Sequence, residues 1–102
     1  MRRVMVRYRV KPGRGQENED LVRDVFAELE ESRAGGFGYA TYRAPDGLTF
    51  VHLARFDTQA NPLEGTDAFA RFLDGIGERC DEPPLVTELH EVASYGAQRV
   101  LP

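Results

Sequence analysis

The sequence predicts an α+β domain with the ferredoxin-like βαββαβ sandwich, in which four antiparallel strands carry two helices on one face. Two observations lead to this prediction. Hydrophobic periodicity follows the order strand, helix, strand, strand, helix, strand over 102 residues. The two central strands are joined by the turn sequence PDG, which is typical of a hairpin. Right-handed crossovers on either side of a central hairpin put both helices on the same face.

The first half of the chain predicts a strand and a long helix. Every second residue from Val4 to Val10 is apolar or aromatic, and the residues between them are mostly arginine, which indicates a strand. The sequence KPGRG ends this strand. From about residue 16 to residue 32 the apolar residues fall at helical spacing, with acidic residues in the first turns, where the helix dipole favours them.

The second half of the chain predicts a hairpin, a second helix and a last strand. Residues 37–44 and 48–56 are the two β-rich runs of the hairpin. Thr66 and Asp67 are both able to cap a helix that the sequence DEPP ends. The apolar face of this predicted helix consists of Phe69, Phe72, Leu73, Ile76 and Cys80. The last strand is predicted from about residue 85 to residue 95.

These elements predict one domain of residues 1–96 and a C-terminal tail of residues 97–102, because the length supports a single hydrophobic core. The formal net charge of −4 argues against a nucleic-acid partner. Arginine interrupts every apolar run near the start, so the sequence predicts no signal peptide and no membrane-spanning segment. We therefore expect a cytoplasmic protein without a membrane partner, and the single cysteine agrees with a reducing compartment.

The sequence predicts no metal ion and no cofactor. It contains only two histidines and one cysteine, and no pair of carboxylates has the spacing of a metal site. Cys80 continues the apolar stripe of the predicted second helix and is expected to be a buried, unreactive side chain.

Both faces of the predicted sheet carry apolar side chains. On the third strand Phe50, Ala54 and Phe56 point one way, whereas Val51 and Leu53 point the other way. A sheet with one face in water alternates more cleanly between apolar and polar residues. We therefore expect a second copy of the chain to cover the outer face, which gives a homodimer.

One known family resembles this chain in three segments. Bacterial members of the antibiotic biosynthesis monooxygenase-like family, in the dimeric α+β barrel superfamily, are similar to it in TFVHLARFDTQANPL, AFARFLDGIGERCDEPP and ELHEVASYG. The resemblance covers the chain from the first strand to Gly96. It implies a substrate pocket between the sheet and the helices of each chain, with two sheets packed back to back. Relatives include cofactor-independent monooxygenases, haem-degrading enzymes, isomerases and lyases.

This resemblance implies a cofactor-independent monooxygenase that acts on a small aromatic or polyketide-like substrate. Phe56 stands at a position where the family often has tryptophan, and the sequence contains no tryptophan, which argues against a haem-degrading enzyme. A non-oxidative isomerase, cyclase or lyase and a non-catalytic dimeric ligand-binding protein remain alternatives, because the fold does not fix the chemistry.

His52 is the candidate catalytic residue. A phenolate or enolate can pass one electron to oxygen, so an oxygenase without a cofactor needs mainly a base and a dry, oriented cavity. Histidine titrates near neutral pH, and His52 shares a strand face with Phe50 and Phe56, which we expect to point toward the helices. The alternative is a core histidine bonded to a backbone group or a carboxylate. His90 is expected at an edge or a dimer contact, close to Glu88 or Glu91.

Aromatic side chains and one asparagine supply the candidate substrate contacts. Tyrosine combines an apolar ring with a polar tip, so it can orient a phenol or a carbonyl, or it can simply pack in the core. Tyr39 and Tyr42 face opposite sides of their strand, so only one of them lines a given pocket. Asn61 either donates to a ligand at the pocket mouth or forms an Asx turn. The candidate substrate-binding residues are Tyr8, Tyr39, Phe50, Phe56, Asn61, Phe69 and Phe72.

Overall fold

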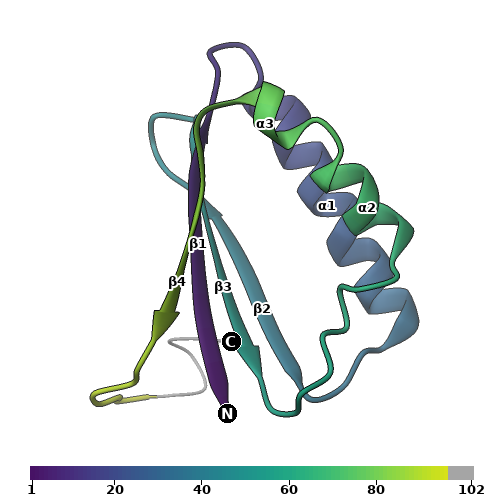
Figure 1. Cartoon of the computed structure of the whole chain (residues 1–102), viewed down its shortest axis with the longest axis vertical. Helices are drawn as coiled ribbons and strands as arrows, with labels where there is room; N and C mark the ends of the chain where they lie inside the picture. The colour runs from purple at the N-terminus through teal and green to yellow at the C-terminus, as the bar shows by residue number, and fades with distance from the viewer. Residues whose placement is uncertain (97–102) are drawn as a thin grey trace.

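Two layers, a sheet and a set of helices on one of its faces, make up residues 1–96, which the computed structural model describes (Figure 1). The predicted tail of residues 97–102 lies outside the described residues. The elements are β1 (Arg2–Val10), α1 (Gly15–Ser32), β2 (Phe37–Arg43), β3 (Thr49–Phe56), α2 (Asp67–Leu73), α3 (Ile76–Arg79) and β4 (Cys80–Leu89). The strands are antiparallel in the order β2-β3-β1-β4, which confirms the predicted ferredoxin-like fold.

The register between β1 and its two neighbours decides which side chains meet on the helix face. Val6 lies opposite His52 of β3 and Val86 of β4, and Tyr8 lies opposite Phe50. Successive side chains of a strand point to opposite faces, so these residues share one face of the sheet. Tyr8 and Phe50 are 1% exposed and His52 is 5% exposed, because the helices cover this face.

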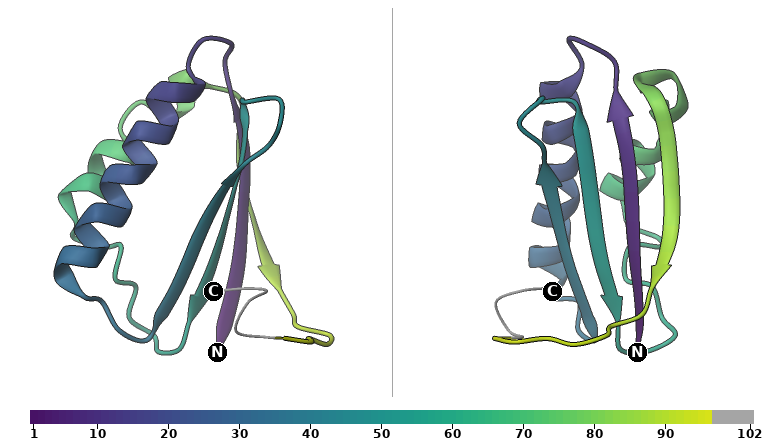
Figure 2. Two further views of the ribbon diagram at one scale, coloured as in Figure 1. Left: turned by 180° about the vertical axis from the view of Figure 1, so that it is seen from behind. Right: turned by 90° about the vertical axis from the view of Figure 1, so that its left-hand side faces the viewer.

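The helices cover different strands of the sheet. α1 lies behind β2 and β3, while α2 and α3 lie behind β1 and β4 (Figure 2). None of the helices within residues 1–96 is long and apolar enough to cross a membrane. The buried apolar side chains between the layers are Val4, Tyr8, Val10, Val22, Val25, Phe50, Phe56, Leu63, Ala68, Phe72 and Cys80.

The two layers are closest at the start of α1 and diverge toward its end, so that together they form a wedge (Figures 1 and 2). Gly15 lies at the narrow end of the wedge. A Cβ atom there would collide with the backbone oxygen of Gly47 and the guanidinium of Arg43. Glycine therefore allows α1 to approach the β2–β3 hairpin this closely.

The predicted second helix is two helices in the structure. α2 ends at Leu73, Asp74 has an extended backbone, and Gly75 has a φ of 74°, in the region that favours glycine. The prediction of one continuous apolar stripe as far as Cys80 was wrong, because Asp74 and Gly75 interrupt the helical path before α3 begins.

A side chain of α1 caps the start of α2. The Glu28 carboxylate accepts the backbone N–H groups of Asp67 and Ala68 at 3.3 and 2.9 Å. Thr66 occupies the N-cap position, but its hydroxyl donates to the backbone oxygen of Leu63. The expected local cap is therefore replaced by a tertiary contact, which ties α2 to α1.

β4 begins and ends earlier than the sequence predicted. The sequence DEPP, expected to break a helix, lies inside this strand, where proline is tolerated because β4 is at the sheet edge. Cys80 is buried as predicted, but it opens β4 opposite Val10 and does not belong to a helix. Residues 90–96 form no strand, so Val92 and Tyr95 are 92% and 96% exposed and do not alternate between sheet faces.

Candidate functional site

A cavity of about 270 Å³ lies between the sheet and the helices, on the side of β1, β4 and α2; we call it the inner cavity. The candidate residues that line it are Tyr8, Tyr39, His52, Phe56, Asn61, Phe69 and Phe72. The other lining residues are Arg2, Val4, Val6, Ala54, Leu63, Leu73, Ile76, Pro84 and Val86. The structure thus brings together all of the candidate residues except Phe50.

Hydroxyl groups hold both ring nitrogens of His52. Nε2 lies 2.8 Å from Tyr8 Oη, while Nδ1 lies 2.7 Å from Tyr39 Oη and 2.9 Å from Thr41 Oγ1. The Asn18 amide donates to Tyr8 Oη at 2.8 Å. His52 is therefore a buried histidine with partners, but these partners are hydroxyls from two neighbouring strands and not the backbone group or carboxylate expected for a core histidine.

The count of donors and acceptors assigns a direction to these bonds. Because Asn18 donates to Tyr8, the Tyr8 hydroxyl directs its own proton to His52 Nε2. Nε2 is then the unprotonated nitrogen, and Nδ1 carries the proton that Tyr39 and Thr41 accept. The opposite tautomer would leave the Tyr8 proton without an acceptor among residues 1–96, so we assign the neutral Nδ1–H form.

A buried arginine stands at the far end of this chain of hydrogen bonds. Arg79 is 2% exposed and donates from Nε to Asn18 Oδ1 at 2.9 Å. Its Nη atoms donate to the backbone oxygens of Phe72 and Asp74 at 2.8 and 3.4 Å. Since Arg79 occupies the oxygen of the Asn18 side chain, the nitrogen of that amide is turned toward Tyr8.

Burial changes the ionisation of three groups in this network. It lowers the pKa of His52 to about 4, so the imidazole is neutral at neutral pH. It raises the pKa of Tyr39 to about 12, and it raises the pKa of Tyr8 well above the ordinary value, although the hydrogen bond from Asn18 acts in the opposite direction. The wall of the inner cavity therefore holds an uncharged chain of proton donors and acceptors.

Aromatic rings form most of the wall around His52. The centroid of the imidazole lies 5.3 Å from that of Tyr8 and 5.6 Å from that of Phe72, and Phe69 stacks beside Phe72 at 6.1 Å. Leu73 and Val86 are 48% and 63% exposed, so the cavity opens to solvent between α2 and β4.

Three of the residues singled out in the sequence have other positions or contacts. Phe50 does not line the inner cavity and stacks on the far side of Tyr8, with ring centroids 5.7 Å apart. Asn61 lines the cavity, and its Oδ1 accepts the backbone N–H of Leu63 at 3.0 Å, which is the Asx turn. His90 is exposed and follows the end of β4. Within residues 1–96 no histidine, cysteine and carboxylate side chains gather into a group that could hold a metal ion.

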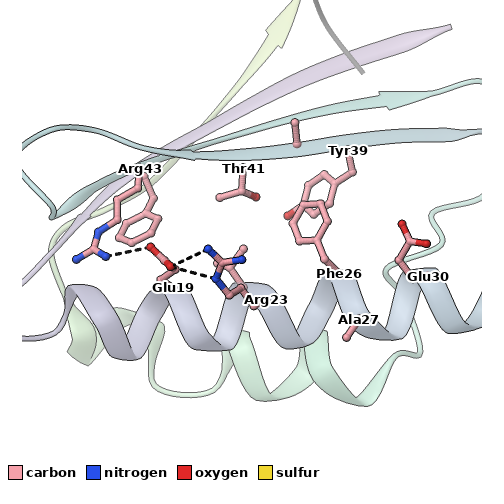
Figure 3. A pocket seen from close by; sticks show the side chains of 11 residues that line it. Glu19, Arg23, Phe26, Ala27, Glu30, Tyr39, Thr41 and Arg43 are labelled. Atoms are coloured by element: carbon pink, nitrogen blue, oxygen red, sulfur yellow. Dashed lines mark hydrogen bonds and ion pairs between the residues drawn. The ribbon is translucent and has the colours of Figure 1, made fainter. Parts of the chain in front are cut away.

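A second space of about 710 Å³ lies between α1 and β2; we call it the outer groove (Figure 3). Toward one end Arg43 and Arg23 contact Glu19 at 3.0 and 3.1 Å, and these hydrogen bonds lower the pKa of Glu19. Further along, Phe26 stacks on Tyr39 with centroids 5.0 Å apart. The remaining lining residues are Val22, Ala27, Glu30, Ala40, Thr41 and Phe50.

Three members of the network are absent from the sequence prediction. Asn18 precedes Val22 by one helical turn and is fully buried, so a polar residue on the apolar face of α1 was a usable signal. Thr41 is two residues from Tyr39 on β2, and this shared face was also readable from the sequence. Arg79 gave no such signal, because its partners come together only in the folded chain.

Solved structures with this arrangement of strands and helices are found among oxygenases. The chain has the fold of antibiotic biosynthesis monooxygenase-like proteins. A structure of an antibiotic biosynthesis monooxygenase matches 91% of this chain and 100% of its own length, with a TM-score of 0.70 and 18% identity. SnoaB from Streptomyces nogalater, a cofactor-independent oxygenase, matches 93% of this chain and 96% of its own, with a TM-score of 0.68 and 14% identity.

The same fold also occurs outside the proteins named as oxygenases. A conserved protein from Methanosarcina mazei Go1 matches 88% of this chain and 91% of its own, with a TM-score of 0.71 and 18% identity. No protein-family model and no curated protein matches the sequence. These identities are low, so the likeness establishes the fold and leaves the chemistry to be argued from the site.

Proposed function

We propose that this protein is a cofactor-independent monooxygenase that oxidises a small phenol in the inner cavity. The observation that carries the proposal is His52, a neutral base with Tyr8 on one nitrogen and Tyr39 and Thr41 on the other, at the wall of a mostly apolar cavity. The fold shared with SnoaB, which is described as a cofactor-independent oxygenase, supports the same class of reaction.

The dimensions of the inner cavity limit the substrate. An apolar cavity of about 150 Å³ accepts benzene, and the inner cavity measures about 270 Å³. A phenol of one or two fused rings therefore fits. Its ring would stack near Phe72, and its hydroxyl would meet Tyr8, the polar tip closest to His52 Nε2.

The network can remove the phenol proton in two linked transfers. The phenol hydroxyl donates to Tyr8 Oη while Tyr8 passes its own proton to His52 Nε2, so that Tyr8 stays neutral. The pKa of Tyr8 is raised by burial, which makes a lasting tyrosinate unfavourable and favours this coupled transfer.

Oxidation then balances without another reductant. The phenolate gives one electron to oxygen, and the resulting phenoxyl radical and superoxide join at a ring carbon that still carries hydrogen. The network then supplies a proton to the ring-bound peroxide anion, and loss of water from the resulting hydroperoxide gives a quinone. In total, a phenol and one molecule of oxygen give a quinone and one molecule of water.

Oxygen consumption tests this proposal. The protein would be incubated with 1-naphthol and related one-ring and two-ring phenols in an oxygen electrode, with and without a chelator. We expect equal amounts of oxygen consumed and quinone formed, and no oxygen returned when catalase is added, because the reduced product is water. Absence of oxygen uptake across the panel contradicts the proposal.

A non-catalytic ligand-binding protein is the second candidate, because side chains of the protein itself already contact both nitrogens of His52. Such a protein would be stabilised against heat by the same phenols and would consume no oxygen. A non-oxidative isomerase, cyclase or lyase would change the ligand, again without oxygen uptake.

We also propose that two copies of the chain pack their outer sheet faces together. Met5 of β1 lies opposite Leu53 of β3, and with Val51 these half-buried side chains form an apolar strip on the face away from the helices. Covering this strip removes apolar surface from water, which favours a homodimer.

A further inference from the structure

His52 stands between the two spaces of the protein. It lines the inner cavity, where Tyr8 contacts its Nε2. Thr41, which contacts Nδ1, lines the outer groove and not the inner cavity, while Tyr39 contacts Nδ1 and lines both spaces. The two nitrogens of one buried ring are therefore connected to two different compartments.

We propose that Tyr39 and Thr41 form a proton outlet that connects His52 to solvent in the outer groove. The inference rests on the proposed function, because it concerns the proton that the phenol releases. It assigns positioning roles to two hydroxyls that act through His52, and it gives the outer groove a role as the aqueous end of the site.

The transfer balances at every atom. When Nε2 accepts a proton from Tyr8, Nδ1 releases its own proton to the oxygen of Thr41 or Tyr39, and that hydroxyl releases its proton to water in the groove. The ring gains one proton and loses one, so it ends neutral with the proton on Nε2. The reverse sequence returns a proton to the cavity and restores the starting tautomer.

Burial explains why an outlet is needed. The ring is 5% exposed, and a charged imidazolium would be costly there. The neighbours of the ring from β1, β2 and α2 are Tyr8, Tyr39, Thr41 and Phe72, all uncharged. The buried cation Arg79 is connected to the ring only through Asn18 and Tyr8. A proton that passes through the ring avoids this cost, whereas a proton that stays on the ring does not.

The outer groove has the character of an aqueous compartment. Glu19, Arg23, Glu30 and Arg43 line it, and the close view shows Tyr39 and Thr41 above α1 between these charged groups (Figure 3). The inner cavity, in contrast, has Arg2 as its one charged lining residue within residues 1–96. Water that exchanges protons is therefore better accommodated on the Nδ1 side of the ring.

Nuclear magnetic resonance of ¹⁵N-histidine protein tests the outlet without a substrate. The nitrogen shifts report which nitrogen of His52 carries the proton, and saturation transfer from water reports how fast that proton exchanges. We expect the Nδ1–H form, and an exchange rate that falls about tenfold or more in the double variant Thr41→Val with Tyr39→Phe, because the relay hydroxyls are lost. Thr41→Ser should keep the wild-type rate.

Two variants with the same chemical change outside the network serve as controls. Thr87→Val and Tyr42→Phe alter the outer face of the sheet and should leave the exchange rate unchanged. Unchanged backbone amide exchange at Val51 and Leu53 would show that the double variant has not altered global opening. The single variants Thr41→Val and Tyr39→Phe provide the comparison if the double variant does not fold.

Two results would overturn the outlet. One is a wild-type spectrum with the proton on Nε2, and the other is an exchange rate that the folded variants leave at the wild-type value. Neither depends on oxygen uptake, so failure of the monooxygenase proposal and failure of the outlet are distinguishable.

Discussion

The two faces of the sheet use the same strands but hold their polar groups in different ways. On the helix face, Tyr8 and His52 are almost fully buried, and side chains satisfy them at distances of 2.7 to 2.9 Å. On the outer face, Arg7 and Arg9 share Glu82 at 3.4 and 3.7 Å, and all three side chains are about half exposed. Exposed pairs of this kind contribute little to stability.

This difference shows that alternation along one strand places neighbouring residues in two different environments. His52 and Leu53 are adjacent in β3, yet His52 belongs to the buried network and Leu53 to the apolar strip of the outer face. A substitution at His52 should therefore leave the apolar strip almost unchanged, and a substitution at Leu53 should leave the buried network almost unchanged.

The largest effect should follow from His52→Gln, which keeps the approximate size of the side chain but cannot accept a proton. If His52 is the base, we expect the rate of phenol oxidation to fall by roughly 10² to 10⁴, the usual contribution of a general base. His90→Gln, in an exposed segment after β4, is the matched control and should keep the wild-type rate. A His52→Gln protein with wild-type turnover would remove His52 from the mechanism.

Acid should reveal the buried histidine through stability. The unfolded chain binds a proton at His52 below about pH 6.5, whereas the folded chain binds one only near pH 4. The free energy of unfolding should therefore decrease as the pH falls through this window, by on the order of 3 kcal/mol from this group. Urea unfolding at several pH values measures it, and His52→Gln should lose this part of the pH dependence. If the free energy of unfolding depended on pH equally in the wild-type protein and in His52→Gln, the buried, neutral ring would be contradicted.

The outer face can be tested by placing charge in its apolar strip. Leu53→Glu should raise the dissociation constant of the proposed dimer roughly a hundredfold, since like charges would meet across the interface. Ala70→Glu, on the exposed side of α2, adds the same charge elsewhere and should leave association unchanged. Sedimentation velocity distinguishes these cases, and a wild-type protein that stays monomeric at micromolar concentration would refute the dimer.

The smallest effect is expected at Asn18, which supports the helix-face network from α1. Asn18→Leu has a similar volume but leaves the Nε of Arg79 and the oxygen of Tyr8 without this partner, which should cost about 2 kcal/mol. Gln16→Leu, at an exposed position two residues earlier in the same helix, should cost much less. If Asn18→Leu and Gln16→Leu were equally stable, water would have to replace the hydrogen bonds of Asn18 without loss of stability.

The sequence was sufficient for the fold where local patterns carry the information. Alternation in β1 and β3 and helical spacing in α1 predicted these elements to within two residues, and the PDG turn predicted the hairpin between β2 and β3. The boundary between the last helix and β4 was wrong. A pair of prolines indicates a break, and only the position of β4 at the sheet edge makes them acceptable in a strand.

The candidate site shows the same division between local and tertiary information. The phase of His52 with Phe56 was enough to predict that its ring points toward the helices. Its partners were not predictable as a set, because Tyr8, Tyr39 and Thr41 meet the ring only in the register that pairs β3 with both β1 and β2. The buried pair of Arg79 and Asn18, which are 61 positions apart, depends on tertiary structure even more strongly.

The close contact at Gly15 restricts how α1 can move relative to the sheet. α1 cannot move nearer to the hairpin at that point, because the backbone of Gly47 and the side chain of Arg43 already fill the space. The contact blocks approach but not separation, so a tilt of α1 about its first turn moves Ser32 further from the sheet than it moves Gly15. The outer groove lies between α1 and β2, so such a tilt widens it, and we expect opening of the groove to appear as faster amide exchange toward the end of α1. Gly15→Ala should push the first turn of α1 away from the hairpin and widen the outer groove, which the accessibility of Tyr39 to solvent would report.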